Sequence, residues 1–180
     1  MNKTFLRILS VLSVAVFLFL SGCSKKSDSN PVGPTNPVTG SGSVTLNGGG
    51  YNNATINFGI GAGGYTSTDQ MTACVIYGAT GNDSLLIVIE FPGKSTGNYQ
   101  WQAFTQNSSN VNGVAVNVYN SKGTNNYFIP AAGGKTNVST YGSVGQTIEG
   151  TFNGTIQDAV TSSTTITISG SFKVLRVPDE

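Results

Sequence analysis

The sequence predicts an all-β fold, organised as a single antiparallel β-sandwich, with a closed lipocalin-like β-barrel as the alternative. From residue 44 onward apolar residues recur with a period of two, and no stretch shows a convincing period of 3.6. Glycine, proline and asparagine divide this region into about ten short strands, a pattern typical of sandwiches and small barrels. The 137 residues from 44 to 180 are enough for one hydrophobic core and too few for two domains of comfortable size.

The strongest strand patterns lie in the middle and at the end of the chain. Residues 85–89 form a continuous apolar run, which predicts a central strand covered on both faces. The glycine-rich stretch 61–64 is expected to be a break between two strands. The expected strands cover residues 44–46, 54–60, 71–77, 85–89, 99–102, 114–119, 125–129, 135–141, 147–156 and 165–174.

The last two strands repeat the motif Ile-x-Gly-[Ser/Thr]-Phe, at 148–152 and 168–172, and a loop over 158–163 suits a hairpin. A pairing centred near residue 160 places Gly150 opposite Gly170 and leaves a notch in the inner face. Because close-packed interiors do not tolerate such voids, an aromatic ring is expected to fill the notch, with Trp101 as the best candidate. The alternative is that each glycine relieves a bend or a bulge.

A short motif near the N-terminus predicts an export leader and a lipid anchor. Lys3 and Arg7 precede an apolar run over residues 8–20, which suits a signal peptide and is too short to span a bilayer as a helix. Leu20-Ser21-Gly22-Cys23 follows directly and resembles the lipobox of bacterial lipoprotein precursors. An ordinary secretory leader is the alternative, but no A-x-A-like cleavage site precedes Cys23.

This resemblance implies that the leader is removed and that Cys23 carries membrane lipid, as diacylglycerol on its sulfur and usually an acyl chain on its new amino group. Buried acyl carbons contribute roughly 0.8 kcal/mol per CH₂, so two or three chains make the attachment effectively permanent. Ser24, where Asp would favour the inner membrane, implies the outer membrane. Lys25 and Lys26 stand where a surface-export tag carries acidic residues, so the periplasmic side is expected, with surface exposure as the alternative.

The resulting organisation has three parts. Residues 1–22 are the signal peptide, and residues 44–180 are the all-β domain. Between them, residues 23–43 are the lipidated cysteine and a tether rich in Pro, Gly and Ser, which has no apolar periodicity and is expected to be disordered. An Asn-Gly turn at 47–48, Gly97-x-Tyr99 and the two Ile-x-Gly-x-Phe motifs give residues 44–177 a resemblance to uncharacterised β-rich lipoproteins of Bacteroidota. The resemblance implies no catalytic residues.

Composition excludes several classes of partner and reaction. From Cys23 onward the chain contains seven Lys and Arg residues and eight Asp and Glu residues, which give a net charge of −1. Nucleic acid is therefore not an expected partner. The chain has no histidine, which removes Ser-His-Asp and Cys-His catalysis and His-based metal centres. Residues 59–64 match G-x-G-x-x-G, but a strand follows them instead of a helix, so a dinucleotide site is not expected. We therefore expect no enzyme, no metal and no cofactor.

Four residues remain as candidates after this exclusion. Cys74 alternates with apolar neighbours and is expected to be a buried small residue. Glu90 lies in an apolar strand, where burial would raise its pKa, although an edge or snorkelling position is preferred. Tyr99 and Trp101 share one strand face, and they form either part of the core or an exposed platform that stacks sugar rings.

The function expected from these observations is that of a non-enzymatic binding or structural module of the cell envelope. The first alternative is a glycan-binding accessory protein that uses Tyr99 and Trp101. The second is a lipocalin-like carrier of an apolar ligand. The expected partners are membrane lipid through acylated Cys23 and either a glycan or an envelope protein.

Overall fold

The computed structural model describes residues 40–104, 112–120 and 125–180, and it confirms the all-β class. These residues form eleven strands and no helix. The signal peptide, the lipobox and most of the tether lie outside the described residues. The strands are β1 (Ser41–Gly48), β2 (Tyr51–Phe58), β3 (Ile60–Thr66), β4 (Met71–Thr80), β5 (Asp83–Pro92), β6 (Gly97–Gln100), β7 (Gly113–Asn120), β8 (Asn125–Pro130), β9 (Lys135–Tyr141), β10 (Thr147–Asp158) and β11 (Thr165–Arg176).

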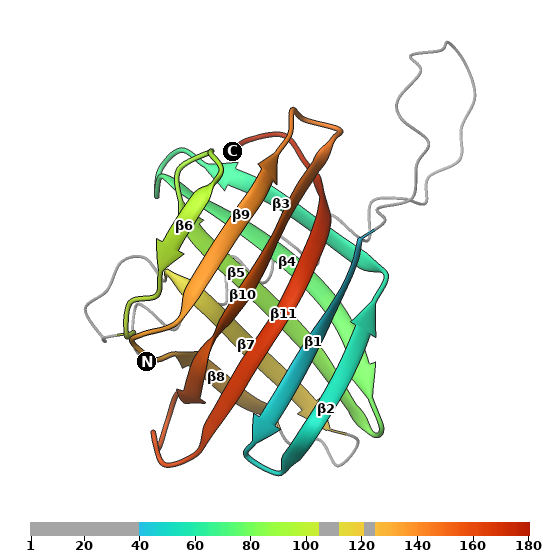
Figure 1. Cartoon of the computed structure of the whole chain (residues 1–180), viewed down its shortest axis with the longest axis vertical. Coiled ribbons are helices and arrows are strands. Elements are labelled where there is room, and N and C mark those ends of the chain that lie inside the picture. Colours follow the sequence, from blue (N-terminus) through green and yellow to red (C-terminus); the bar gives the residue numbers. More distant parts are fainter. Residues whose placement is uncertain (1–39, 105–111, 121–124) are drawn as a thin grey trace.

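The strands form two crossing layers that share hydrogen bonds at two corners (Figure 1). One layer has the order β2-β1-β11-β10-β9-β6, and the other has the order β3-β4-β5-β7-β8. β10 pairs with β8 at one corner, and β11 pairs with β3 at the other. The pairings therefore fit both descriptions that the sequence left open, a sandwich and a closed ring. The β11–β3 pairing is parallel, whereas the other pairings of the described strands are antiparallel.

One hydrophobic cluster fills the space between the layers. Alternate residues of every long strand point inward, as the period of two predicts, because successive side chains of a strand lie on opposite faces. The inward residues of both layers belong to the same cluster, which also contains Cys74 and Trp101. Cys74 is fully buried, so its expected place in the core is confirmed.

The glycine-rich stretch 61–64 does not break the sheet, and this prediction was wrong. It lies in β3, which the sequence divided between a strand over 54–60 and a break. The glycines are needed because β3 packs closely against side chains of β4 and β11 at this corner. A Cβ at Gly61 would lie 2.7 Å from Val174, and one at Gly63 would lie 2.8 Å from the sulfur of Cys74. Residues 41–43, assigned by sequence to the tether, likewise belong to β1.

The hairpin of β10 and β11 forms as predicted, but its register differs from the predicted one. Gly150 pairs with Phe172, and Phe152 pairs with Gly170, so the two glycines do not face each other. Each glycine instead makes room for a ring of the opposite strand, because a Cβ at either position would lie 2.8 Å from the facing phenylalanine. The shift follows from the turn, in which the side chain of Asp158 accepts hydrogen bonds from two backbone N–H groups and Ser162 has a φ of 54°.

Trp101 fills a glycine notch, although at another place. Its ring lies against Gly134, on the turn before β9, and against Gly154, on β10. A Cβ at Gly154 would overlap the Trp101 ring and lie 2.7 Å from the Cα of Gly134. Three glycines of β10 and β11 therefore serve as contact points for three different aromatic rings.

Replacement of Gly154 by alanine tests this contact. We expect Gly154→Ala to lower the free energy of unfolding by about 1–3 kcal/mol, because an added methyl group in a packed core forces the ring or the strand to move. Urea denaturation followed by far-UV circular dichroism measures the change. Gly59→Ala is the matched control, since the nearest atom to its Cβ is 4.0 Å away, and it is expected to be neutral or slightly stabilising. Equal effects of the two substitutions would contradict the contact.

Candidate functional site

The Tyr99–Trp101 pair, which the sequence offered as a stacking platform, lies inside the molecule. Trp101 is 4% exposed, and its indole N–H donates to the Thr136 hydroxyl at 2.9 Å. Tyr99 is half-buried and stacks on Phe91 with 5.0 Å between the ring centroids. Both rings are therefore occupied by protein, so this pair presents no platform to a sugar.

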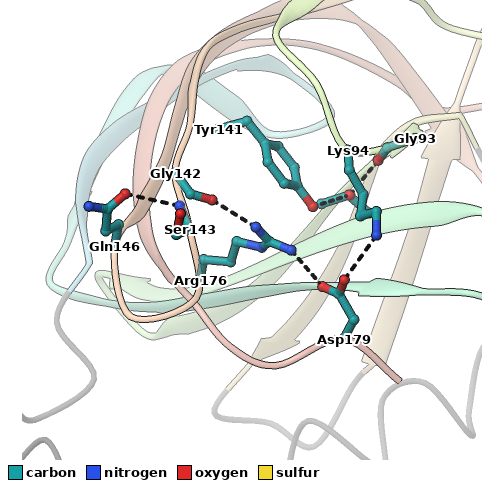
Figure 2. A network of polar contacts seen from close by, with 9 residues as sticks. Gly93, Lys94, Tyr141, Gly142, Ser143, Gln146, Arg176 and Asp179 are labelled. Atoms are coloured by element: carbon teal, nitrogen blue, oxygen red, sulfur yellow. Dashed lines mark hydrogen bonds and ion pairs between the residues drawn. The ribbon is translucent and has the colours of Figure 1, made fainter.

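A polar network closes the corner between β3 and β11, and Figure 2 shows its members converging from β9, β11 and the C-terminal residues. Arg176 donates to the carbonyl oxygen of Gly142 and to Asp179, each at 2.8 Å, and its guanidinium lies 4.8 Å from the centre of the Tyr141 ring. Lys94 forms the second ion pair of Asp179, at 3.2 Å. The hydrogen bonds from Arg176 and Lys94 lower the pKa of Asp179.

This network holds the corner together, and its charged side chains, Lys94, Arg176 and Asp179, are paired with one another. The backbone after Arg176 continues along β3, where the N–H of Val177 donates to the carbonyl of Gly63 at 2.9 Å. The Tyr141 hydroxyl shares a 2.9 Å hydrogen bond with Thr72, which is fully buried. Burial raises the pKa of Tyr141 above its ordinary value, so its hydroxyl stays protonated at neutral pH. We assign this network to the structure of the corner.

The outer surface of the β3–β4–β5–β7–β8 layer carries a group of residues that we call the tyrosine face. Strand pairing aligns five of them in a transverse row, and the sixth, Tyr119, lies two residues beyond Asn117 on β7. They face outward because their neighbours along each strand point into the core. The tyrosine face consists of Ile60, Tyr77, Leu86, Asn117, Tyr119 and Tyr127.

The large side chains at the β3–β4 end of this row and at Tyr119 are open to solvent. Ile60 is 48% exposed, Tyr77 is 47% exposed and Tyr119 is 40% exposed. They are three of the five exposed large hydrophobic residues among the described residues, and they gather on one surface. Leu86 lies between the two tyrosines and is half-buried. The continuous apolar run 85–89 predicted a strand covered on both faces, and this prediction is confirmed for the inner face and only in part for the outer face, where Leu86 and Val88 are half-buried.

Asn117 positions the Tyr119 side chain. The Asn117 amide donates a 2.7 Å hydrogen bond to the Tyr119 hydroxyl, although the two residues are separated by only one residue on the same strand. Two residues of a strand span about 6.6 Å, roughly the reach of a tyrosine side chain, so this bond requires the ring to lie along the strand. The other amide atom of Asn117, Oδ1, is buried without a hydrogen-bond partner.

Glu90 lies on the same outer surface, toward the other end of β5. Burial, and then the neighbouring Asp69 carboxylate, raise the pKa of Glu90 to about 7. Its strand is central, paired with β4 and β7, so the edge position preferred from the sequence was wrong. Tyr127 is also affected, because burial and then Glu90 raise its pKa above the ordinary value. The Glu90 carboxyl is therefore mostly protonated below about pH 7 and mostly ionised above it.

Other kinds of site are less well supported by the described residues. Burial raises the pKa of the Cys74 thiol, which keeps it protonated and unreactive. Within residues 40–104, 112–120 and 125–180, no three His, Cys, Asp or Glu side chains lie where they could hold a metal ion together. The same residues include no helix of the length and apolarity that a membrane span requires.

Comparisons of the chain with models of protein families, with curated proteins and with solved structures give no match. The candidate site is therefore the tyrosine face, chosen from its exposure and geometry. Sequence reasoning missed it because Tyr77 and Tyr119 lie in different strands, and their common face depends on the pairing of both strands with β5. The outward residues of β5, Leu86 and Val88, were the available signal, since an ordinary solvent-facing strand carries polar residues there.

Proposed function

We propose that the chain is a lipoprotein of the cell envelope, attached to the outer membrane through acylated Cys23 and facing the periplasm. Its β-domain acts as a binding or structural module and not as an enzyme. The observation that carries this proposal is the lipobox-like Leu20-Ser21-Gly22-Cys23 at the end of an apolar leader. The described fold begins at Gly40, whose N–H donates to the carbonyl of Gly59, so sixteen residues separate it from Cys23.

The charged groups of the domain support a non-enzymatic role. Asp158 caps a turn, Glu149 pairs with Lys173 at 2.8 Å, and Asp83 accepts a hydrogen bond from Tyr51 at 3.1 Å. Each of these carboxylates has a structural partner. Catalysis needs a proton donor or acceptor with a matched pKa beside a bound substrate. Glu90 has such a pKa and the Asp69 carboxylate near it, but burial covers its side chain, and the residues paired with it across β4 and β7, Ala73 and Gly113, carry no reactive group.

The alternative of a carrier for an apolar ligand has less support. A carrier needs an internal chamber of several hundred cubic ångströms, typically about 300–1,000 Å³. The interior of this domain instead contains a continuous cluster in which the rings of Phe152, Phe172 and Trp101 lie against glycines. The supported role is therefore one that uses the surface of the domain.

Replacement of Cys23 tests the anchor. In cells supplied with labelled palmitate, we expect the natural chain to incorporate label and to sediment with the outer membrane. Cys23→Ser should lose the label and remain as the uncleaved precursor, because the sulfur is the acceptor of the lipid. Cys74→Ala is the matched control and should be labelled normally, since that thiol is buried. A Cys23→Ser protein that is cleaved and released like a normal secreted protein would rule the anchor out.

A further inference from the structure

We infer that the tyrosine face is a binding surface for an uncharged polysaccharide, whose pyranose rings stack on Tyr77 and Tyr119. This inference goes beyond the proposed membrane attachment and does not depend on it. It rests on the exposure of the two rings, on the hydrogen bond that orients one of them, and on the absence of Lys and Arg from the described strands of this face.

The orientation of Tyr119 is suited to stacking. Its hydroxyl accepts the 2.7 Å hydrogen bond from Asn117, so the ring lies along β7 instead of standing upright from the sheet. With 40% of the residue exposed, the ring presents a face to solvent. Aromatic faces carry partial negative charge, and the C–H bonds on one side of a pyranose carry partial positive charge, so the two surfaces attract each other.

The separation of the two tyrosines suits a linear chain of sugars. Tyr77 is on β4 and Tyr119 is on β7, with β5 between them. Two strand spacings amount to about 10 Å, and Tyr119 lies two residues, about 6.6 Å, beyond the row that contains Tyr77, so the two residues are roughly 12 Å apart, slightly more than the length of two linked pyranose units in an extended chain. Leu86 lies between the tyrosines and supplies an apolar floor. A flat sheet can therefore contact consecutive rings of one polysaccharide without a pocket.

The polar groups on the face favour a sugar over a lipid surface. The Tyr119 hydroxyl accepts a bond from Asn117, so its own hydrogen remains available to a ligand. Asn117 is 6% exposed, so the Tyr119 hydroxyl is the group of this pair that a ligand reaches. Hydrocarbon offers no acceptor for that hydroxyl, so a bilayer would leave it unsatisfied.

The absence of basic side chains favours a polysaccharide over a single-stranded nucleic acid as the ligand. The described residues of this face include no Lys or Arg, and Glu90 is the carboxylate of its central strand that points outward. Proteins that stack the bases of single-stranded nucleic acid combine aromatic rings with a positively charged groove. A neutral polysaccharide needs no such groove, and stacking with hydrogen bonds to hydroxyl groups is sufficient.

Affinity electrophoresis of the mature lipid-bearing chain in detergent tests this inference. Native gels contain one soluble polysaccharide each: hydroxyethylcellulose, galactomannan, laminarin, dextran or the anionic polygalacturonate. We expect at least one neutral polysaccharide to retard the natural chain. Tyr77→Ala/Tyr119→Ala should weaken that retardation at least about tenfold, because truncated aromatic anchors commonly dominate such contacts. Val160→Ala is the control, an exposed apolar residue of the β10–β11 turn, and should bind normally.

Two further measurements separate the possible results. Tyr77→Phe keeps the ring and should retain most of the binding, while an unchanged emission maximum of buried Trp101 shows that each variant is folded. Phosphatidylcholine vesicles are tested in parallel with a lipid-free chain of residues 24–180, expressed without the leader and without Cys23. Retardation by none of the neutral polysaccharides, or equal retardation of the double alanine variant, would overturn the inference. So would a double alanine variant that loses vesicle binding alone, because the face would then be a membrane contact.

Discussion

Trp101→Ala is expected to lower the free energy of unfolding by about 3–5 kcal/mol, the range for removal of a large buried aromatic side chain. Trp101 touches glycines of three separate segments, at positions 113, 134 and 154, and a glycine cannot extend a side chain to fill the space that remains. The substitution also removes the donor that bonds to the fully buried Thr136 hydroxyl. A loss of this size is comparable to the whole stability of many domains.

Urea denaturation must be followed by far-UV circular dichroism, because the chain contains a single tryptophan. Trp101→Phe should lose less, since a smaller ring still fills part of the space between Gly134 and Gly154. Val160→Ala should change stability by less than about 0.5 kcal/mol, as expected for an exposed position. A Trp101→Ala loss below about 1 kcal/mol would show that the Trp101 ring is not an essential part of the core.

Glu90→Gln is expected to remove a pH dependence of stability worth about 3 kcal/mol. Burial raises the pKa of Glu90 from 4.5 to about 7 in the folded chain. Between these values the folded state binds more protons than the unfolded state, so stability falls as the pH rises from 4.5 to 7. Each pKa unit corresponds to about 1.4 kcal/mol, which sets the size of the effect. Glutamine has nearly the same shape and no charge to bury.

The measurement compares the natural chain with Glu90→Gln at pH 4.5 and at pH 8. The variant should gain about 3 kcal/mol relative to the natural chain between these two values. Glu149→Gln is the control with the opposite sign, because the hydrogen bond from Lys173 lowers the pKa of Glu149, and its loss should slightly destabilise the folded chain at pH 8. If the stabilities of the natural chain and Glu90→Gln change in parallel with pH, the Glu90 carboxylate is solvated.

The sequence predicted the strands whose side chains alternate, and it missed the one whose inner side chains are absent. β10 and β11 were placed correctly because large apolar residues occupy most of the alternate positions on their inner face. β3 was missed because Gly61 and Gly63 occupy the buried positions, so no apolar period remains to be seen. Apolar periodicity can be seen only where inward side chains exist, whereas the packing at β3 leaves no room for side chains at its inward positions.

Register and surface were harder to predict because both depend on distant contacts. The hairpin register depends on how Asp158 caps its turn. Because the turn is centred one residue later than predicted, every residue of the hairpin has a different partner, and Gly150 pairs with Phe172 instead of Gly170. The sequence left open whether Trp101 is buried or exposed, because the glycines that its ring packs against, Gly134 and Gly154, lie 33 and 53 residues away in the chain. The tyrosine face required the pairing of β4, β5 and β7, which no local pattern encodes.

The pairing of β1 with β11 joins the first described strand to the last, with Ser41 opposite Lys173. Folding therefore cannot be completed while the chain is still being synthesised, because β11 supplies the partner of both β1 and β3. Contacts between such distant parts of a chain slow folding, since the intervening loop must close before any contact is gained. A polypeptide of this topology stays open until its last strand is made, which is the state that the proposed export across a membrane requires.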